Sequence, residues 1–103
     1  MPPRNFEEFW PYYVDQHRNA VSRRLHFTGT LLMLLCLAAM PFYPPALLAA
    51  PVAGYGLAWI GHFVFERNRP ATFGHPWWSL RGDLRMCRLI LLGKMGAELS
   101  RGP

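Results

Sequence analysis

The feature that most constrains this chain is a run of 41 residues without a single charged side chain. Residues 25–65 contain no Lys, Arg, Asp or Glu, although the 103 residues together carry eleven basic and six acidic ones. A soluble domain of this size needs charged groups along its surface, whereas hydrocarbon disfavours them. We therefore expect residues 25–65 to lie in a lipid bilayer, within an integral membrane protein that forms one domain, residues 1–103.

Prolines divide the uncharged run into two parts. Pro41, Pro44 and Pro45 fall within five positions, which no helix interior accommodates. The sequence therefore predicts an all-α fold built on a helical hairpin, with helices at about 25–39 and 46–65 joined by a tight turn. The second helix would rise about 30 Å, one hydrocarbon thickness, whereas the shorter first helix would cross only where the bilayer thins.

The flanks of the hairpin predict helices at the membrane surface. In the N-terminal flank, Asn5 followed three residues later by Glu8 is a helix-capping pattern. Pro11 interrupts the segment, however, and favours an interfacial helix with an aromatic face that begins at Trp10 or Pro11 and ends near Asn19.

Residues 84–99 predict an amphipathic helix, because Arg81, Arg85 and Arg88 recur at helical spacing and form one basic face. Residues 68–79, which contain two prolines and two tryptophans, predict an ordered loop at headgroup level.

Positive charge predicts the orientation of the hairpin. Arg18, Arg23 and Arg24 precede it, Arg67 and Arg69 follow it, and the connecting turn has no basic residue. By the positive-inside rule, both termini are expected in the cytoplasm. The basic residues that give the net charge of +5 lie on both sides of an apolar run and form no continuous stripe. We therefore expect them to contact anionic lipid headgroups and not nucleic acid. A hairpin of two helices buries little surface within one chain, so association of several copies into a homo-oligomer stays an open alternative to a monomer.

Four histidines are expected to converge at the cytoplasmic end of the hairpin. His26 is the second residue of the uncharged run and His62 is the fourth from its end, so an antiparallel hairpin brings them to one depth. His17 lies shortly before the hairpin and His75 shortly after it, while Glu66 follows His62 by four residues, on the same helix face. Imidazoles with one carboxylate and open positions are typical of ferrous iron that reacts with oxygen.

Plainer interpretations compete with this metal hypothesis. A single histidine at a helix end is usually an interfacial or capping residue, and Glu66 could pair with Arg67 or Arg69. Asp83 is a further candidate, either as a ligand or as the acceptor of an imidazole N–H. The metal-site interpretation is favoured because the histidines lie at matched depth in a segment that has no charged residue. No nucleotide-binding glycine motif and no haem-attachment sequence occurs in the chain, so no other cofactor is expected.

The motifs around these histidines resemble those of a known family. They are Tyr13-x-x-x-His17, Arg24-Leu25-His26-Phe27-x-Gly29 and Gly61-His62-Phe63-Val64-Phe65-Glu66, followed by Pro70-Ala71. Their ordered combination, over about residues 6–86, is similar to the fungal 2-hydroxy fatty acid dioxygenases and to compact bacterial members of that family. The resemblance implies an iron(II)-dependent membrane enzyme of fatty-acid α-oxidation, with iron held by His17, His26, His62 and Glu66. The family pattern requires no histidine at His75.

The implied reaction is consistent with the rest of the sequence. A 2-hydroxy fatty acid and O2 give the acid one carbon shorter, CO2 and water with no external reductant, so iron suffices as the cofactor. We expect Arg69 or Arg81 to hold the substrate carboxylate. The fungal enzymes have further membrane segments between the second and third histidine motifs, so the resemblance does not fix the substrate. Two alternatives stay open: a non-enzymatic membrane scaffold or subunit with interfacial histidines, and another metal-dependent lipid oxidase or hydroxylase.

Overall fold

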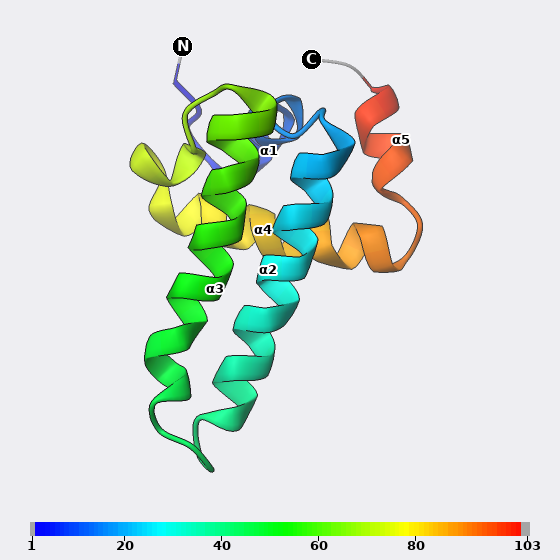
Figure 1. Cartoon of the computed structure of the whole chain (residues 1–103). Coiled ribbons are helices and arrows are strands. Elements are labelled where there is room, and N and C mark those ends of the chain that lie inside the picture. The colour runs from blue at the N-terminus through cyan, green and yellow to red at the C-terminus, as the bar shows by residue number, and fades with distance from the viewer. Residues whose placement is uncertain (1, 102–103) are drawn as a thin grey trace.

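The computed structural model describes residues 2–101, which form helices and no strand. In chain order these are α1 (Phe6–Asp15), α2 (Ala20–Ala39), α3 (Ala46–Ile60), the π-helix η1 (Gly61–Glu66), the 3-10 helix η2 (Ala71–Phe73), α4 (Pro76–Leu91) and α5 (Met95–Ser100). The all-α prediction is confirmed. Helices α2 and α3 stand side by side as a long hairpin, and α4 crosses it near the end opposite the turn, where α1 and α5 also lie (Figure 1).

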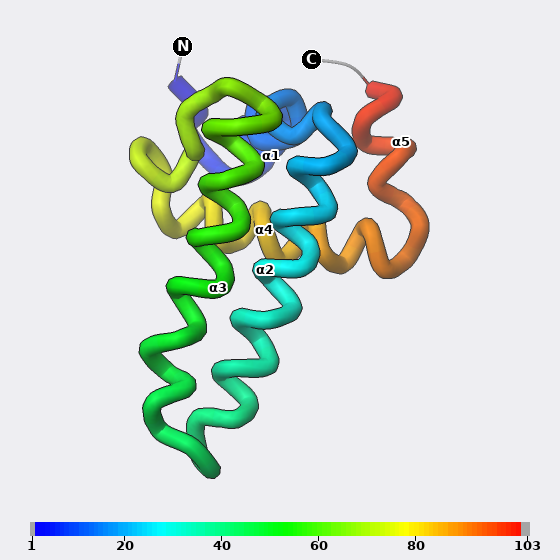
Figure 2. The backbone as a smooth tube through the Cα atoms, in the orientation of Figure 1, coloured from blue at the N-terminus to red at the C-terminus, as the bar shows by residue number. Residues whose placement is uncertain are grey.

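The hairpin has the predicted connection but a longer first helix. The chain runs down α2, reverses at the proline-rich turn and returns along α3 into η1 (Figure 2). Helix α2 begins at Ala20 and not at residue 25, because the Asn19 side chain caps it by accepting from the backbone N–H groups of Val21 and Ser22. The two helices touch closely at Gly29, where a Cβ atom would lie 3.0 Å from the carbonyl oxygen of Ala53.

Membrane crossing has partial support from the described residues. Residues Ala46–Glu66 form the one helix between residues 2 and 101 that is long and apolar enough to cross a membrane. Large apolar side chains far from α4 are also exposed on the hairpin, among them Leu35, Leu48 and Val52. A bilayer-spanning hairpin with both termini in the cytoplasm stays a prediction.

The flanking helices have other boundaries than those predicted, although the predicted cap at Asn5 is present. Helix α1 begins at Phe6, because the side chain of Asn5 accepts from the backbone N–H of Glu8 at 2.9 Å and caps it, and Pro11 lies inside the helix. Helix α4 begins at Pro76 and so includes the last residues, 76–79, of the segment predicted as a loop, because proline fits the first turn of a helix. It ends at Leu91, where Gly93 with a φ of 70° separates it from α5.

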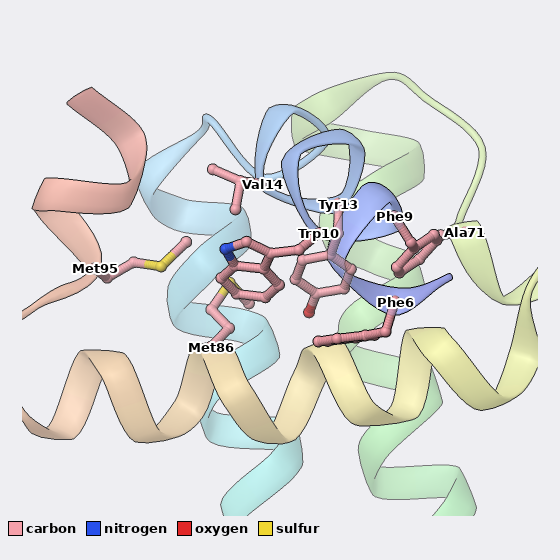
Figure 3. Close-up of a cluster of buried hydrophobic side chains, with 8 residues drawn as sticks. All are labelled: Phe6, Phe9, Trp10, Tyr13, Val14, Ala71, Met86 and Met95. Atoms are coloured by element: carbon pink, nitrogen blue, oxygen red, sulfur yellow. The ribbon is translucent and has the colours of Figure 1, made fainter. Parts of the chain in front are cut away.

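The aromatic face of α1 is a protein core and not a membrane-facing surface. Its side chains pack against α4, with contributions from η2 and α5 (Figure 3). The cluster comprises Phe6, Phe9, Trp10, Tyr13, Val14, Ala71, Met86 and Met95. The rings of Trp10 and Tyr13 stack with centroids 5.4 Å apart, and Tyr13 stacks in turn on His17 at 4.1 Å. The core therefore extends to the first of the candidate metal ligands.

Close packing of α4 against Tyr13 depends on Gly82. A Cβ atom at Gly82 would lie 2.8 Å from two carbon atoms of the Tyr13 ring. We expect Gly82→Ala to lower the free energy of unfolding by about 1–3 kcal/mol, because the ring must shift, although alanine favours helices. Denaturation in detergent measures this. The control is Gly96→Ala in α5, where an added Cβ meets nothing within 4 Å. Equal stability of the two variants would contradict the close approach.

Candidate metal centre

Three histidines from separate segments meet at one point. His26 lies in α2, His62 in η1 and His17 in the short link between α1 and α2. Their ring centroids are 4.4 to 4.8 Å apart, and each ring offers a nitrogen within 4.8 Å of those of the other two. All three side chains are buried, with no more than 3% of any of these residues exposed. The arrangement is the convergence that the sequence predicted for these three positions.

Backbone carbonyls fix the tautomers of two of the rings. The Nδ1–H of His17 donates to the carbonyl oxygen of Tyr13 at 2.6 Å, and that of His26 donates to the carbonyl oxygen of Ser22 at 3.0 Å. A carbonyl oxygen only accepts hydrogen bonds, so each Nδ1 carries its proton. In a neutral imidazole the other nitrogen, Nε2, is then an unprotonated acceptor.

Asn68 fixes the third ring in the same way. Its Oδ1 lies 2.6 Å from Nδ1 of His62, and its Nδ2 donates to the carbonyl oxygen of Gln16 at 3.1 Å. The second contact orients the amide, so Oδ1 must be the atom that accepts from His62. Asn68 reaches back to His62 because Arg67 adopts a left-handed conformation (φ 57°, ψ 43°), which turns the chain at the end of η1.

Three Nε2 lone pairs therefore share one buried space. Nε2 of His17 lies only 3.1 Å from Nε2 of His26. Two acceptors so close together repel each other unless a cation lies beside them. Burial, with the facing rings of His26 and His62, lowers the pKa of His17 well below its ordinary value, which keeps the ring in its metal-binding form. Three imidazole nitrogens suit zinc, iron or a related transition metal, and they leave coordination positions open.

Glu66 lies outside this group of three. Its Oε1 accepts from the backbone N–H of Asn19 at 2.7 Å. The spacing of four residues places Glu66 on the same side as His62 but one turn farther along, level with the N-terminus of α2. A carboxylate is favoured there by the helix dipole. Glu66 therefore joins η1 to the start of α2, and the structure brings together three histidines rather than three histidines and an acid.

The two lower-ranked candidates lie in different places. His75 precedes α4 and stacks on Trp78, with ring centroids 5.1 Å apart, away from the three histidines. Asp83 lines the same small cavity as the three histidines and accepts a hydrogen bond from the Tyr13 hydroxyl. Burial raises the pKa of Asp83 to about 7 against the opposing effect of that bond, and burial together with Asp83 raises the pKa of Tyr13.

Neither arginine expected to hold a substrate carboxylate lines the histidine cavity. The guanidinium carbon of Arg69 lies 5.2 Å from the ring centroid of Phe73, and that of Arg81 lies 4.1 Å from the ring centroid of Phe6. Arg81 precedes Asp83 by two residues, and two residues in a helix turn by about 200°, so the two side chains leave α4 on opposite sides.

A comparison with known families matches residues 3–95 to the family described as 2-hydroxy-palmitic acid dioxygenase Mpo1-like. The matched span contains all three clustered histidines and their hydrogen-bond partners. No curated protein and no solved structure matches the chain. The matched family is the one that the histidine motifs resemble.

Proposed function

The chain belongs to the Mpo1-like family, and from this premise we propose that it is an iron(II)-dependent dioxygenase of 2-hydroxy fatty acids. The reaction would be R–CH(OH)–COOH + O2 → R–COOH + CO2 + H2O, in which the substrate supplies all four electrons. The observation that supports this best is the set of three unprotonated imidazole nitrogens turned toward one buried point.

The residues of the centre fit the metal that this reaction needs. His17, His26 and His62 would hold it through Nε2, and iron(II) bound there would supply Lewis acidity and activation of oxygen. The substrate carries its hydroxyl and carboxylate on adjacent carbons, so both oxygens can reach the positions that three protein ligands leave open. Burial of all three histidines excludes bulk water from the reacting groups.

The surrounding residues hold the ligands in place. The three Nδ1–H groups donate hydrogen bonds to the backbone carbonyls of Tyr13 and Ser22 and to the side-chain oxygen of Asn68. These bonds keep each ring in one tautomer and one orientation. Asp83 accepts a hydrogen bond from the Tyr13 hydroxyl, which fixes the phenol ring that stacks on His17. These contacts support a preorganised site in which little has to move when the metal binds.

We place the enzyme in a membrane with both termini in the cytoplasm. The exposed apolar side chains of the hairpin support this, and a water-insoluble substrate would reach the site from the bilayer. Its acyl chain would lie along the hairpin, where each buried methylene contributes about 0.8 kcal/mol.

An anaerobic loading experiment tests the proposed function. Purified protein is loaded with iron(II), supplied with 2-hydroxypalmitate and then exposed to oxygen. We expect pentadecanoate and CO2 in equimolar amounts with the oxygen consumed, and no product from palmitate. A scaffold would bind no stoichiometric metal and form no product. A hydroxylase would act on palmitate, require a reductant and leave the chain length unchanged; either result would contradict the proposal.

A further inference from the structure

The histidine cavity contains two buried hydrogen-bond donors that have no acceptor. The hydroxyl of Ser79 and the indole nitrogen of Trp59 are buried and make no hydrogen bond within residues 2–101. Both residues line the cavity together with the three histidines. Buried donors without partners are rare in folded proteins, because the donor loses its water and gains nothing in return. Two of them beside one candidate metal centre indicate a ligand that supplies acceptors.

The two donors approach the cavity from different helices. Ser79 lies in the first half of α4 and is 3% exposed, whereas Trp59 lies in the last turn of α3. The indole ring packs against Phe73, with centroids 5.2 Å apart, and against Tyr55 at 6.0 Å. Trp59 is therefore held by its neighbours. Donors on two sides of a cavity suit a ligand group with two acceptor oxygens.

A second small cavity, with a mixed apolar and polar lining, adjoins the histidine cavity. Ala58 and Asp83 line the histidine cavity and also this second cavity, between α2, α3 and α4. The other residues of the second cavity are Thr30, Met33, Gly54, Tyr55 and Leu80. A ligand with its polar head at Ser79 and Trp59 would direct the first carbons of its tail past Ala58, toward the apolar part of the second cavity. The surrounding side chains would have to move to admit it.

We propose that the Ser79 hydroxyl and the Trp59 indole N–H bind the carboxylate of the 2-hydroxy acid, an inference that rests on the proposed function. Neutral donors suffice for this task, because a divalent cation held by neutral imidazoles already attracts an anionic ligand. The one carboxyl group that lines the cavity, Asp83, is itself engaged by the Tyr13 hydroxyl. Arg69 and Arg81, the charged alternatives, lie outside the cavity.

Removing each donor in turn tests this assignment. Ser79→Ala and Trp59→Phe are purified in detergent, loaded anaerobically with iron(II) and titrated calorimetrically with 2-hydroxyoctanoate. Loss of a hydrogen bond to a charged acceptor predicts affinity about ten- to hundredfold lower in each variant, with metal content unchanged. The diol 1,2-octanediol, which lacks the carboxylate, should bind wild type and variants equally.

Matched variants outside the cavity provide the control. Ser100→Ala removes an exposed serine hydroxyl, and Trp77→Phe alters a tryptophan that is 81% exposed. Both should bind 2-hydroxyoctanoate as wild type does. Unchanged affinity in Ser79→Ala and Trp59→Phe, with metal bound, would overturn this assignment and leave the proposed function standing. Wild-type protein that binds no metal would overturn both. If one of the two variants loses its metal, the other, from a different helix, still decides the question.

Discussion

Replacing His26 by alanine is expected to abolish stoichiometric metal binding. The change removes one of three nitrogens from the cluster, whereas losing only a supporting contact to a ligand typically costs 10- to 100-fold in affinity. We therefore expect a loss of more than about 100-fold. Alanine suits the interior of α2, so the helix should persist. Equilibrium dialysis of detergent-purified protein against iron(II) or zinc, followed by elemental analysis, measures the bound metal.

The matched control is His75→Ala. His75 lies outside the cluster, so this variant should bind as much metal as the wild type. Thermal unfolding gives a second measurement: metal at 100 times its dissociation constant should stabilise the wild type and His75→Ala by about 2.7 kcal/mol, and His26→Ala hardly at all. Retention of metal by His26→Ala, or its loss from His75→Ala, would show that the ion binds elsewhere.

The pairing of His26 with His62 could be predicted because it depends only on the hairpin. A proline-rich turn fixes where the chain reverses, and helical stretches of similar length on its two sides, residues 26–39 and 46–62, then bring the two histidines to nearly the same depth. His17 follows from its short distance to the start of α2. The structure agrees at all three positions, since local sequence determines the helices and the turn that place them.

The environment of the aromatic residues in α1 could not be read from their pattern. An aromatic helix face is typical both of a membrane interface and of a buried core, and Phe9 and Tyr13 satisfy either description. What distinguishes the two is the position of α4, which depends on a helix start at Pro76 and on contacts with residues distant in the sequence. The same tertiary packing decides that Asp83 reaches the cavity and Arg81 does not.

The acid at Glu66 shows a different limit of sequence reasoning. A spacing of four residues predicts a shared helix face, but it does not say whether the second side chain is level with a site formed by other helices. The residue that does support His62 is Asn68, which lies beyond the end of η1. Its approach requires the left-handed conformation of Arg67, which is uncommon for residues other than glycine and which nothing in the sequence predicts for an arginine.

Replacing Asn68 by alanine is expected to weaken metal binding by about 10- to 100-fold while leaving all three ligands in place. The reason is that the Nδ1–H of His62 loses its acceptor, so the ring can rotate or change tautomer and Nε2 no longer stays free for the metal. Asn68→Asp keeps an oxygen acceptor and should recover part of the affinity. Competition with a chromophoric zinc chelator measures all three proteins on one scale.

Glu66→Gln gives the contrasting result that makes this prediction specific. A glutamine oxygen can still accept from the backbone N–H of Asn19, so the tie between η1 and α2 is kept, and the variant should hold metal within about twofold of the wild type. If instead Glu66→Gln loses metal and Asn68→Ala does not, the carboxylate is the fourth ligand and the outer hydrogen bond to His62 is dispensable. The order of the two affinities therefore decides between a site of three histidines and a site of three histidines and an acid.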